Sequence, residues 1–226
     1  ARVPRGTRMK LCALSVDLDE IACYHAIHGL PMPDDASAHA VYARAVPRYL
    51  ELFDALGVPC AFFVIGRDLD HDVARDGAKA LAAAGHELAN HTLHHRYDLT
   101  HLPEEAIRAE VRGGVEAIER ATGERAVGFR APGYTITDAV FDALAAEGVT
   151  YDSSVFPCPM YWGVKTAKIG LIRAQGRRSS SVVDTPMVLT APADPYVPAR
   201  PYWRKAPHGS ALLEIPIGVT RLPRLP

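Results

Sequence analysis

The sequence predicts an α/β protein with a parallel sheet, in which strands alternate with crossover helices. Short apolar runs of the kind that form buried strands alternate along the chain with longer stretches of helical periodicity. In addition, each unusual cluster of polar residues directly follows an expected strand. Because α/β barrels build their active sites at the carboxyl ends of the strands, this placement also predicts a functional site there.

The expected elements follow one another in a regular order. Apolar runs predict strands at residues 10–16, 58–65, 86–89, 126–129, 149–151 and 211–217. Periodic stretches, several of them ended by a glycine, predict helices at residues 38–56, 72–84, 103–121, 137–147 and 162–175. Pro47 lies inside the first of these helices and is expected to kink or split it. Residues 21–37 are expected to form a long loop, and residues 176–210 an extended insertion.

Length and composition indicate a single domain with a substantial core. The chain has 226 residues, of which 48% are hydrophobic and 23% are charged, and these fractions are ordinary for a globular protein. Residues 1–9 are basic and lack an apolar stretch, so we interpret them as an N-terminal extension. Residues 10–226 are interpreted as one domain.

Charge and cysteine usage limit the classes of partner and compartment. The formal net charge of -1 gives no support to a nucleic-acid or anionic-membrane partner, and no apolar run approaches the roughly 20 residues that span a bilayer. The four cysteines, at positions 12, 23, 60 and 158, show no paired spacing and are expected to be reduced and buried. This pattern favours a cytoplasmic location, with the cell envelope as the alternative. The sequence does not predict an oligomeric state.

The segment 86–95, HELANHTLHH, holds four histidines in ten residues. His91 and His95 are four apart, and on a helical turn this spacing places both rings on one face, where they can bind the same cation. His94, three residues after His91, is the alternative second ligand. His86 and Glu87 fall within the expected strand, so we assign them structural roles.

Polar residues from four expected strands should meet at one mouth of the barrel. Asp17 and Asp19 follow the first strand, the histidine pair follows the third, Arg130 the fourth and Asp152 the fifth. Common signatures of other enzyme classes, such as GxSxG, GxxxxGK[ST] and GxGxxG, do not occur in the sequence.

Four short motifs occur in order after successive expected strands: SVDLDE, HTLHH, RAPGY and YDSS. Together they resemble the polysaccharide deacetylase family, the NodB-like carbohydrate esterases. The first motif has the Asp-x-Asp form that one branch of the family uses. The resemblance covers roughly residues 10–155 and implies a distorted (β/α) barrel of the NodB type. It also implies metal-dependent removal of N- or O-acyl groups.

The resemblance implies a metal site, and the residue types agree with it. The family pattern selects His95 over His94, so that Asp19, His91 and His95 would bind one divalent ion. Three protein ligands suit catalytic zinc, with cobalt, nickel or manganese as alternatives. Asp17 would act as the general base, and Arg130 would pair with Asp17 and favour its ionised form.

Further residues receive expected roles around this site. A backbone N–H near Gly133 or Tyr134 would help to stabilise the oxyanion of the reaction. His25 and His28 lie in the expected loop 21–37 and are candidates for contact with substrate. Asp152 is grouped with Asp17 and Arg130 as a catalytic residue, and it is expected either to line the site or to hold another group.

The leading functional hypothesis is a metal-dependent hydrolase that removes an N-acetyl group from an amino sugar or polysaccharide. The alternatives are a deformylase or amide hydrolase acting on a lipid-linked sugar or small cyclic amide, and a non-catalytic carbohydrate-binding protein. The partner is therefore expected to be a carbohydrate or another N-acylated small molecule.

The general acid is the one expected part without a clear residue. The late Leu-x-His motif that supplies it in the family has no counterpart after Leu213. We therefore expect the acid, together with elements that close the barrel, to lie beyond Pro226. His208 is the fallback candidate within the chain.

Overall fold

The computed structural model describes residues 12–27, 29–176, 179–207 and 212–226. In this part of the chain, six strands follow one another in sequence order across one sheet, and every pair of neighbours is parallel. The strands are β1 (Ser15–Asp17), β2 (Ala61–Val64), β3 (Glu87–Asn90), β4 (Gly128–Phe129), β5 (Tyr151–Asp152) and β6 (Leu213–Glu214). They form the half-barrel of the predicted distorted barrel, so the expected fold class is confirmed.

The strand register places the last residues of successive strands next to one another. Asn90 pairs with Phe129, Phe129 pairs with Asp152, and Asp152 pairs with Glu214. Because all strands run in one direction, the segments that leave their carboxyl ends emerge at the same edge. The register therefore gathers the polar segments that the sequence places after the strands.

Four long helices cover the sheet: α3 (Val46–Leu56), α4 (Asp72–Ala83), α5 (Glu104–Thr122) and α6 (Asp138–Ala146). Phe62 of β2, Leu81 of α4 and Ile118 of α5 are fully buried in one hydrophobic cluster. A second cluster, farther along the sheet, includes Phe129 and Leu144.

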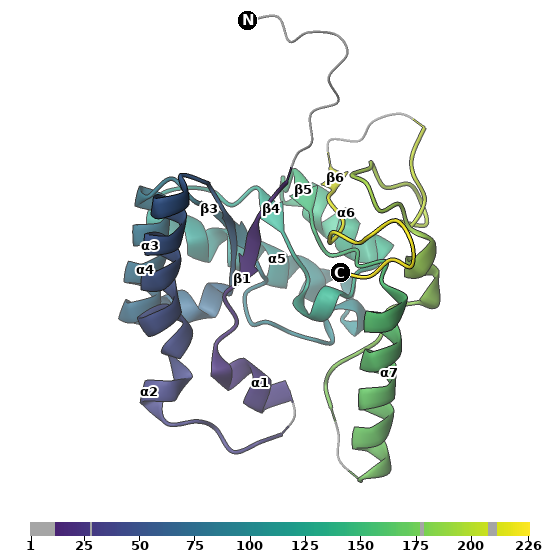
Figure 1. Ribbon diagram of the computed structural model, residues 1–226, viewed down its shortest axis with the longest axis horizontal. Coiled ribbons are helices and arrows are strands. Elements are labelled where there is room, and N and C mark those ends of the chain that lie inside the picture. Colours follow the sequence, from purple (N-terminus) through teal and green to yellow (C-terminus); the bar gives the residue numbers. More distant parts are fainter. Residues whose placement is uncertain (1–11, 28, 177–178, 208–211) are drawn as a thin grey trace, which may run out of the picture.

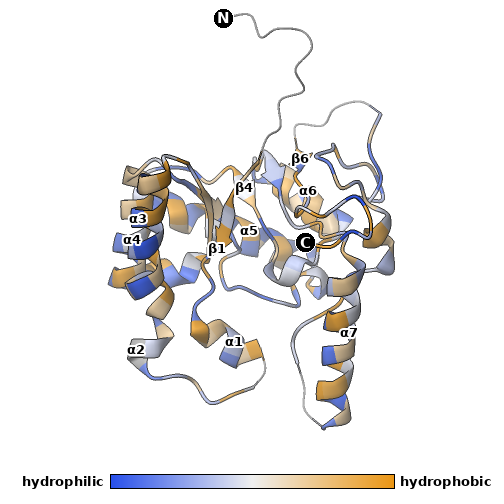
Figure 2. Ribbon diagram, in the orientation of Figure 1, coloured by the Kyte–Doolittle hydropathy of each residue, from blue (hydrophilic) through white to orange (hydrophobic). Residues whose placement is uncertain are grey.

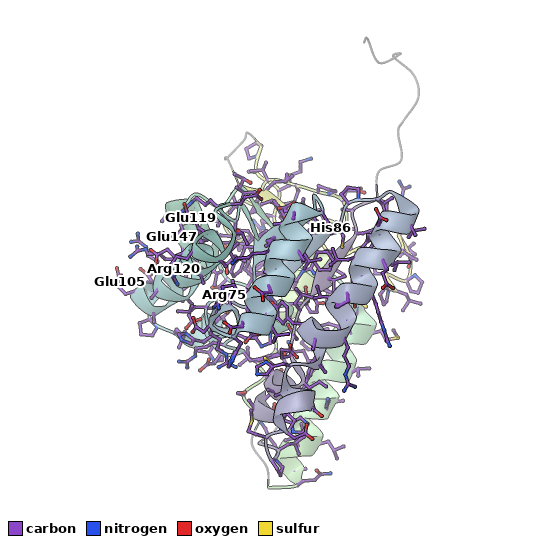
Figure 3. All side chains as sticks on the ribbon, turned by 90° about the vertical axis from the view of Figure 1, so that its left-hand side faces the viewer. Arg75, His86, Glu105, Glu119, Arg120 and Glu147 are labelled. Atoms are coloured by element: carbon purple, nitrogen blue, oxygen red, sulfur yellow. The ribbon has the colours of Figure 1, made fainter. Side chains whose placement is uncertain are left out.

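Charged side chains cover the surface that these helices turn to solvent. Figure 3 shows the exposed residues Glu105, Glu119 and Arg120 of α5 there. Arg112 of the same helix binds Glu147 at 2.8 Å. Apolar residues thus face the sheet and charged residues face solvent, as helical periodicity predicts.

Pro47 divides the first long helical stretch, as expected. A π-helical turn, Val41–Ala45, precedes α3, and Pro47 lies within the first two positions of α3. Proline lacks the backbone N–H that a helix interior requires, so the regular hydrogen-bond pattern can begin only there.

The prediction of a long loop at residues 21–37 was wrong. The segment contains helix α1 (Ile21–Ile27) and a short helix α2 (Asp35–Ala38). Glu20, which precedes α1, accepts hydrogen bonds from the backbone N–H groups of Val41 (3.0 Å) and Tyr42 (3.1 Å). This buried carboxylate connects the start of α1 to the π-helical turn that precedes α3. Local sequence patterns do not reveal such a long-range contact.

The late part of the chain is more ordered than an extended insertion. Helix α7 (Pro159–Ala174) begins three residues before the expected start, and a 3-10 helix spans Pro186–Thr190. Tyr202 donates a 2.7 Å hydrogen bond to Asp184, and Tyr196 pairs with Glu214 of β6. The first contact lies within the segment, and the second attaches it to the sheet. Among the described residues, no helix is both long and apolar enough to cross a bilayer.

The cysteines are free, as expected, and Cys23, Cys60 and Cys158 are buried. Cys12 is exposed, which corrects the expectation that all four are buried.

Candidate metal centre and active site

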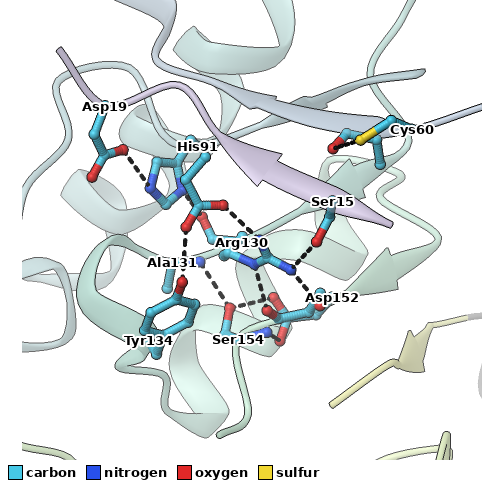
Figure 4. Close-up of polar contacts among 12 residues, drawn as sticks. Ser15, Asp19, Cys60, His91, Arg130, Ala131, Tyr134, Asp152 and Ser154 are labelled. Carbon is cyan, nitrogen blue, oxygen red and sulfur yellow. Dashed lines mark hydrogen bonds and ion pairs between the residues drawn. The ribbon is translucent and has the colours of Figure 1, made fainter. Parts of the chain in front are cut away.

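The predicted site residues meet at the carboxyl ends of β1, β3 and β4. Asp17 ends β1 and Asp19 lies two residues later, whereas His91 directly follows β3 and Arg130 directly follows β4. Figure 4 shows His91 beside Asp19, with Arg130 at the centre of a neighbouring set of polar contacts. Residues that are more than 100 positions apart, such as Asp17 and Arg130, are thus in direct contact.

Asp19, His91 and His95 form one compact cluster. Their potential ligand atoms all lie within 4.8 Å of one another. One carboxylate oxygen of Asp19, Oδ1, lies 3.3 Å from Nε2 of His91, and Oδ2 lies 3.3 Å from Nε2 of His95. Both histidine side chains are only 2% exposed. One oxygen and two nitrogens at these separations are a donor set that suits zinc and related divalent ions.

The residues present fit a metal ion by a second observation as well. Oδ1 of Asp19 and Nε2 of His95 are buried without a hydrogen bond of ordinary geometry. Buried polar atoms normally have partners, and a cation bound between these atoms would provide one. Asp19, His91 and His95 are therefore the residues that would hold the ion.

His91 is held in the tautomer that metal binding requires. Its Nδ1 lies 2.6 Å from the carbonyl oxygen of Arg130. A carbonyl only accepts hydrogen bonds, so Nδ1 carries the proton and Nε2, on the side of Asp19, is left with its lone pair. Such a contact from the other ring nitrogen is typical of metal-binding histidines.

The electrostatics of the cluster are dominated by burial and by Asp19. Burial alone would raise the pKa of Asp19, but the adjacent rings of His91 and His95 hold that pKa well below its usual value. Burial lowers the pKa of His95, which favours the neutral ring. Burial also acts to lower the pKa of His91, yet its contact with Asp19 raises this pKa above the usual value.

The two histidines do not meet through a helical turn, which corrects our argument from spacing. Residues 91–95 form an irregular loop in which Thr92 (φ 67°) and His95 (φ 55°) have left-handed backbone conformations. The backbone N–H of His95 donates to the hydroxyl of Thr92 at 2.9 Å, and that of Gly66 donates to the Thr92 carbonyl at 2.9 Å. This loop brings the ring centroids of His91 and His95 to 4.8 Å.

His94 points away from the cluster. Its Nδ1 lies 2.8 Å from one carboxylate oxygen of Glu110, and its backbone N–H donates to the other at 2.9 Å. Glu110 belongs to α5, so this pair fastens the histidine loop to the helix. His94 therefore has a structural contact of its own and does not lie with the potential ligands.

Arg130 and Asp17 form the expected ion pair. Nη1 of Arg130 lies 2.6 Å from Oδ1 of Asp17, and Nη2 donates to the hydroxyls of Ser15 and Ser153 at 2.9 Å each. Arg130 is 4% exposed. The hydroxyl of Tyr134 donates to the other oxygen of Asp17, Oδ2, at 3.1 Å. Two donors from different elements thus fix the orientation of the Asp17 carboxylate.

The prediction that the backbone N–H of Tyr134 stabilises an oxyanion was wrong. Its backbone N–H already donates to the carbonyl of Ala131 at 3.0 Å. The tight turn at Gly133 (φ 64°) and Tyr134 (φ 58°) instead aims the Tyr134 side chain at Asp17. The carbonyl of Gly133 accepts a 2.7 Å hydrogen bond from Lys165.

Asp152 lies beneath the site and does not line it. It is fully buried and accepts hydrogen bonds from the hydroxyl (2.6 Å) and the backbone N–H (3.0 Å) of Ser154. Ser154 in turn accepts a 2.8 Å hydrogen bond from the N–H of Ala131 (Figure 4). Of the two alternatives that the sequence left open, Asp152 therefore holds another group, the turn that follows Arg130.

A cavity of about 510 Å³ opens above Asp17, Asp19 and His91. Its walls come from α1 and α7, two helices that extend beyond the sheet in Figure 1. Side chains that sequence reasoning missed line this cavity: Tyr24, Tyr97, Tyr161, Lys165 and Lys168. Gly133 and Tyr134 line it as well.

His25, one of the two histidines expected to contact substrate, is not among the residues that line this cavity. The ring of His25 contacts the carbonyl of Pro31 within its own segment, and its neighbours Tyr24 and Ile27 face the cavity instead. His28 and His208 lie outside the described residues.

The fold and the site together place the chain in a class of α/β proteins: a parallel half-barrel with a potential metal-ligand cluster, Asp19-His91-His95, at its mouth. The family model for polysaccharide deacetylases matches residues 34–151, more than half of the chain. The chain therefore belongs to the polysaccharide deacetylase family, as its motifs predict.

Similar proteins support this assignment at the level of fold and sequence. The "Peptidoglycan deacetylase-like protein FGM2" of Gibberella zeae is 28% identical over 158 residues, which is 68% of this chain and 46% of that protein. The structure titled "Crystal structure of putative polysaccharide deacetylase from Mycobacterium smegmatis" is 24% identical with a TM-score of 0.62, over 91% of this chain and 58% of that one. A mutant of BA3943 from Bacillus anthracis, a "CE4 family pseudoenzyme with restored enzymatic activity", is 20% identical with a TM-score of 0.50, over 77% and 56% of the two chains. The chain spans about half the length of the curated relative.

Proposed function

We propose that this protein is a metal-dependent hydrolase that removes the N-acetyl group from an amino sugar or polysaccharide. The observation that carries the proposal is the Asp19-His91-His95 cluster with the Asp17–Arg130 pair beside it at one cavity. Family membership supports the deacetylase activity, and the name of the curated relative supports a carbohydrate substrate.

Asp19, His91 and His95 would hold one divalent ion, most simply zinc, with cobalt, nickel or manganese as alternatives. When bound, such an ion acidifies a water molecule and polarises the acyl carbonyl. The role of His91 depends on the Arg130 carbonyl, because this contact keeps the lone pair of Nε2 directed toward Asp19. Asp19 is ionised at neutral pH, since its two histidine contacts hold its pKa well below the usual value against the effect of burial.

Asp17 would act as the general base that takes the proton from the attacking water. It lines the cavity, and its carboxylate is oriented on one side by Arg130 and on the other by the Tyr134 hydroxyl. Arg130 is itself held by Ser15 and Ser153, so the base cannot rotate freely. A positioned base of this kind typically contributes a factor of about 10² to 10⁴ in rate.

The cavity wall is suited to a sugar ring. Four tyrosines line it, from α1, from the loop after β3, from the turn after β4 and from α7: Tyr24, Tyr97, Tyr134 and Tyr161. Aromatic rings offer flat apolar faces and hydroxyl groups together, a combination that suits small polar ligands with apolar faces.

The proposal is tested by acetate release from chito-oligosaccharides, with and without a chelator. We expect release by the untreated protein, loss of release with chelator, and recovery when zinc is added back. Asp17→Asn should retain the bound metal but lose about 10²-fold or more of the turnover. Asp76→Asn, an exposed aspartate of α4, serves as the matched control and should behave as the unmodified protein.

Turnover that survives complete metal removal, or an Asp17→Asn variant as active as the control, would reject the mechanism. Binding of the oligosaccharide with no acetate release would favour the non-catalytic alternative, because a pseudoenzyme shares this fold. Release of formate but not acetate from matched substrates would favour the deformylase alternative.

A further inference from the structure

One face of α7 forms part of the wall of the cavity that Asp19 and His91 also line. Tyr161, Lys165, Lys168 and Ile172 line the cavity, and their spacing of four, three and four residues places them along one side of the helix. Figure 2 shows hydrophobic and hydrophilic residues alternating along α7, which stands apart from the main sheet. Two ammonium groups therefore face the space in which a substrate would sit.

Lys165 reaches the turn that positions Tyr134. Its Nζ donates a 2.7 Å hydrogen bond to the carbonyl of Gly133. A side-chain carbon placed on Gly133 would lie 3.0 Å from the Tyr97 ring and 3.4 Å from Nζ of Lys165, so the ammonium and this ring are close neighbours. The Tyr97 ring packs edge-on against His95, with 4.9 Å between centroids. The Tyr97 ring thus lies next to both the Gly133 turn, which Lys165 contacts, and the His95 ring of the cluster.

The negative charges at the cavity floor are already compensated. Asp17 is paired with Arg130 at 2.6 Å, and Asp19 contacts both histidines at 3.3 Å. A bound divalent ion would add positive charge to this floor. The lysines on α7 consequently add charge that the floor does not neutralise.

Lys165 also lacks a close carboxylate partner within the described residues. Burial lowers the pKa of Lys165 to about 8, and the opposing effect of Asp184 is smaller. Asp184 is already engaged, because it accepts hydrogen bonds from the Tyr202 hydroxyl (2.7 Å) and from backbone N–H groups. A half-buried cation without a carboxylate partner is costly, and a negative group on a ligand would reduce that cost.

We propose that Lys165, with Lys168 three residues farther along α7, forms a subsite for an anionic group of the substrate. The inference rests on the proposed function and narrows it: the acylated sugar carries a carboxylate or a phosphate near the group that is removed. Nζ of Lys165 has three N–H donors, of which the Gly133 carbonyl takes one, so two remain for the anion. The tyrosine wall would hold the ring between this subsite and Asp17.

Binding and turnover of three probes test the subsite: N-acetylglucosamine (neutral), N-acetylmuramic acid (carboxylate) and N-acetylglucosamine 1-phosphate (phosphate). Dissociation constants are measured by calorimetry in the Asp17→Asn background, which keeps all three expected metal ligands. We expect at least one anionic probe to bind about tenfold or more tightly than the neutral probe, as for a charge-assisted hydrogen bond. The anion that gains more identifies the source, carboxylate or phosphate.

Lys165→Gln, added to the same background, is the decisive change. Glutamine keeps a donor for the Gly133 carbonyl but removes the charge, so the anionic preference should fall to within about twofold of none, with binding of the neutral probe nearly unchanged. Lys168→Gln should weaken the preference in part. Lys79→Gln, an exposed lysine of α4, is the matched control and should retain it fully.

Equal affinity for all three probes, or an anionic preference that survives Lys165→Gln in a folded protein, overturns the subsite. The outcome is separable from the proposed function, because calorimetry does not depend on turnover. An anionic preference without acetate release from any probe by the unmodified protein would reject the hydrolase and leave the subsite standing. Acetate release with no preference for the anionic probes would reject the subsite and support the hydrolase.

Discussion

Arg130 is the residue that connects the two halves of the candidate site. Its guanidinium contacts Asp17, Ser15 and Ser153, and its own carbonyl accepts the hydrogen bond that orients His91. One residue after β4 thus positions both the proposed base and a proposed metal ligand. The planar guanidinium can do this because its five N–H donors point in fixed directions.

Arg130→Ala should lower turnover, but less than Asp17→Asn does. The substitution removes one of the two donors that orient the Asp17 carboxylate and leaves the carboxylate itself in place. The measurement is kcat for acetate release at saturating substrate in both variants and in the unmodified protein. Turnover of Arg130→Ala equal to that of the unmodified protein would show that the Arg130–Asp17 pair does not position the base.

The residues of the site could largely be predicted from the sequence, whereas their geometry could not. Asp17, Asp19, His91, His95 and Arg130 converge as expected, because each directly follows a strand of a parallel sheet. The helical spacing argument failed because left-handed residues and long-range hydrogen bonds, which sequence spacing does not encode, shape the histidine loop.

At the scale of elements, the contact between α5 and the histidine loop depends on glycine. A side-chain carbon on Gly114 of α5 would overlap the amide oxygen of Asn90 and lie 3.0 Å from the backbone of Thr92. On Gly113 it would overlap the Leu93 side chain. Glycine in a helix interior is normally unfavourable, so these two positions serve the close approach of the loop.

Gly114→Ala should therefore destabilise the protein by about 1–3 kcal/mol, the usual cost of overpacking, and weaken metal binding by displacing the loop. Gly163→Ala in α7 is the control, because a side chain there meets nothing within 4 Å and should stabilise by roughly 0.5–1 kcal/mol. Urea unfolding monitored by circular dichroism gives both values. A Gly114→Ala variant that is as stable as the unmodified protein, or more stable, would show that the loop does not need this close approach.

The cavity walls were the part of the architecture that the sequence did not reveal. Residues 21–27 were expected to form part of a loop. A helix was expected at residues 162–175, but the sequence did not connect it with the site. Both elements are positioned by contacts distant in sequence, such as Glu20 with Tyr42 and Lys165 with Gly133. Local periodicity predicts that a helix forms, but it does not predict which cavity the helix will face.

At the scale of the whole molecule, a pair of buried acids connects the last two strands of the described sheet. Asp152 of β5 and Glu214 of β6 are fully buried and lie opposite each other in the strand register. Burial, and then the adjacent Asp152 carboxylate, raise the pKa of Glu214 well above its usual value. Glu214 is thus protonated in the folded protein, whereas in the unfolded chain it loses its proton near pH 4.5.

The stability of the unmodified protein should therefore fall relative to that of Glu214→Gln as pH rises above about 4.5. The unfolded chain binds fewer protons than the folded protein over this window, so the free energy of unfolding decreases by up to about 1.4 kcal/mol per pH unit. The loss ends once pH exceeds the folded pKa. Urea unfolding of both proteins at several pH values measures the difference, and a difference that does not change with pH would contradict the protonated assignment.

The central claim, that Asp19, His91 and His95 hold one divalent ion, is tested most directly by the metal content of purified protein. Elemental analysis should find about one divalent ion per chain in the unmodified protein and in His94→Ala, because His94 contacts Glu110 instead of the cluster. His95→Ala removes one of three ligands and should lose most of the metal under the same conditions. Unmodified protein without stoichiometric metal after supply of zinc, cobalt, nickel and manganese, or metal that is lost from His94→Ala but retained by His95→Ala, would contradict the account.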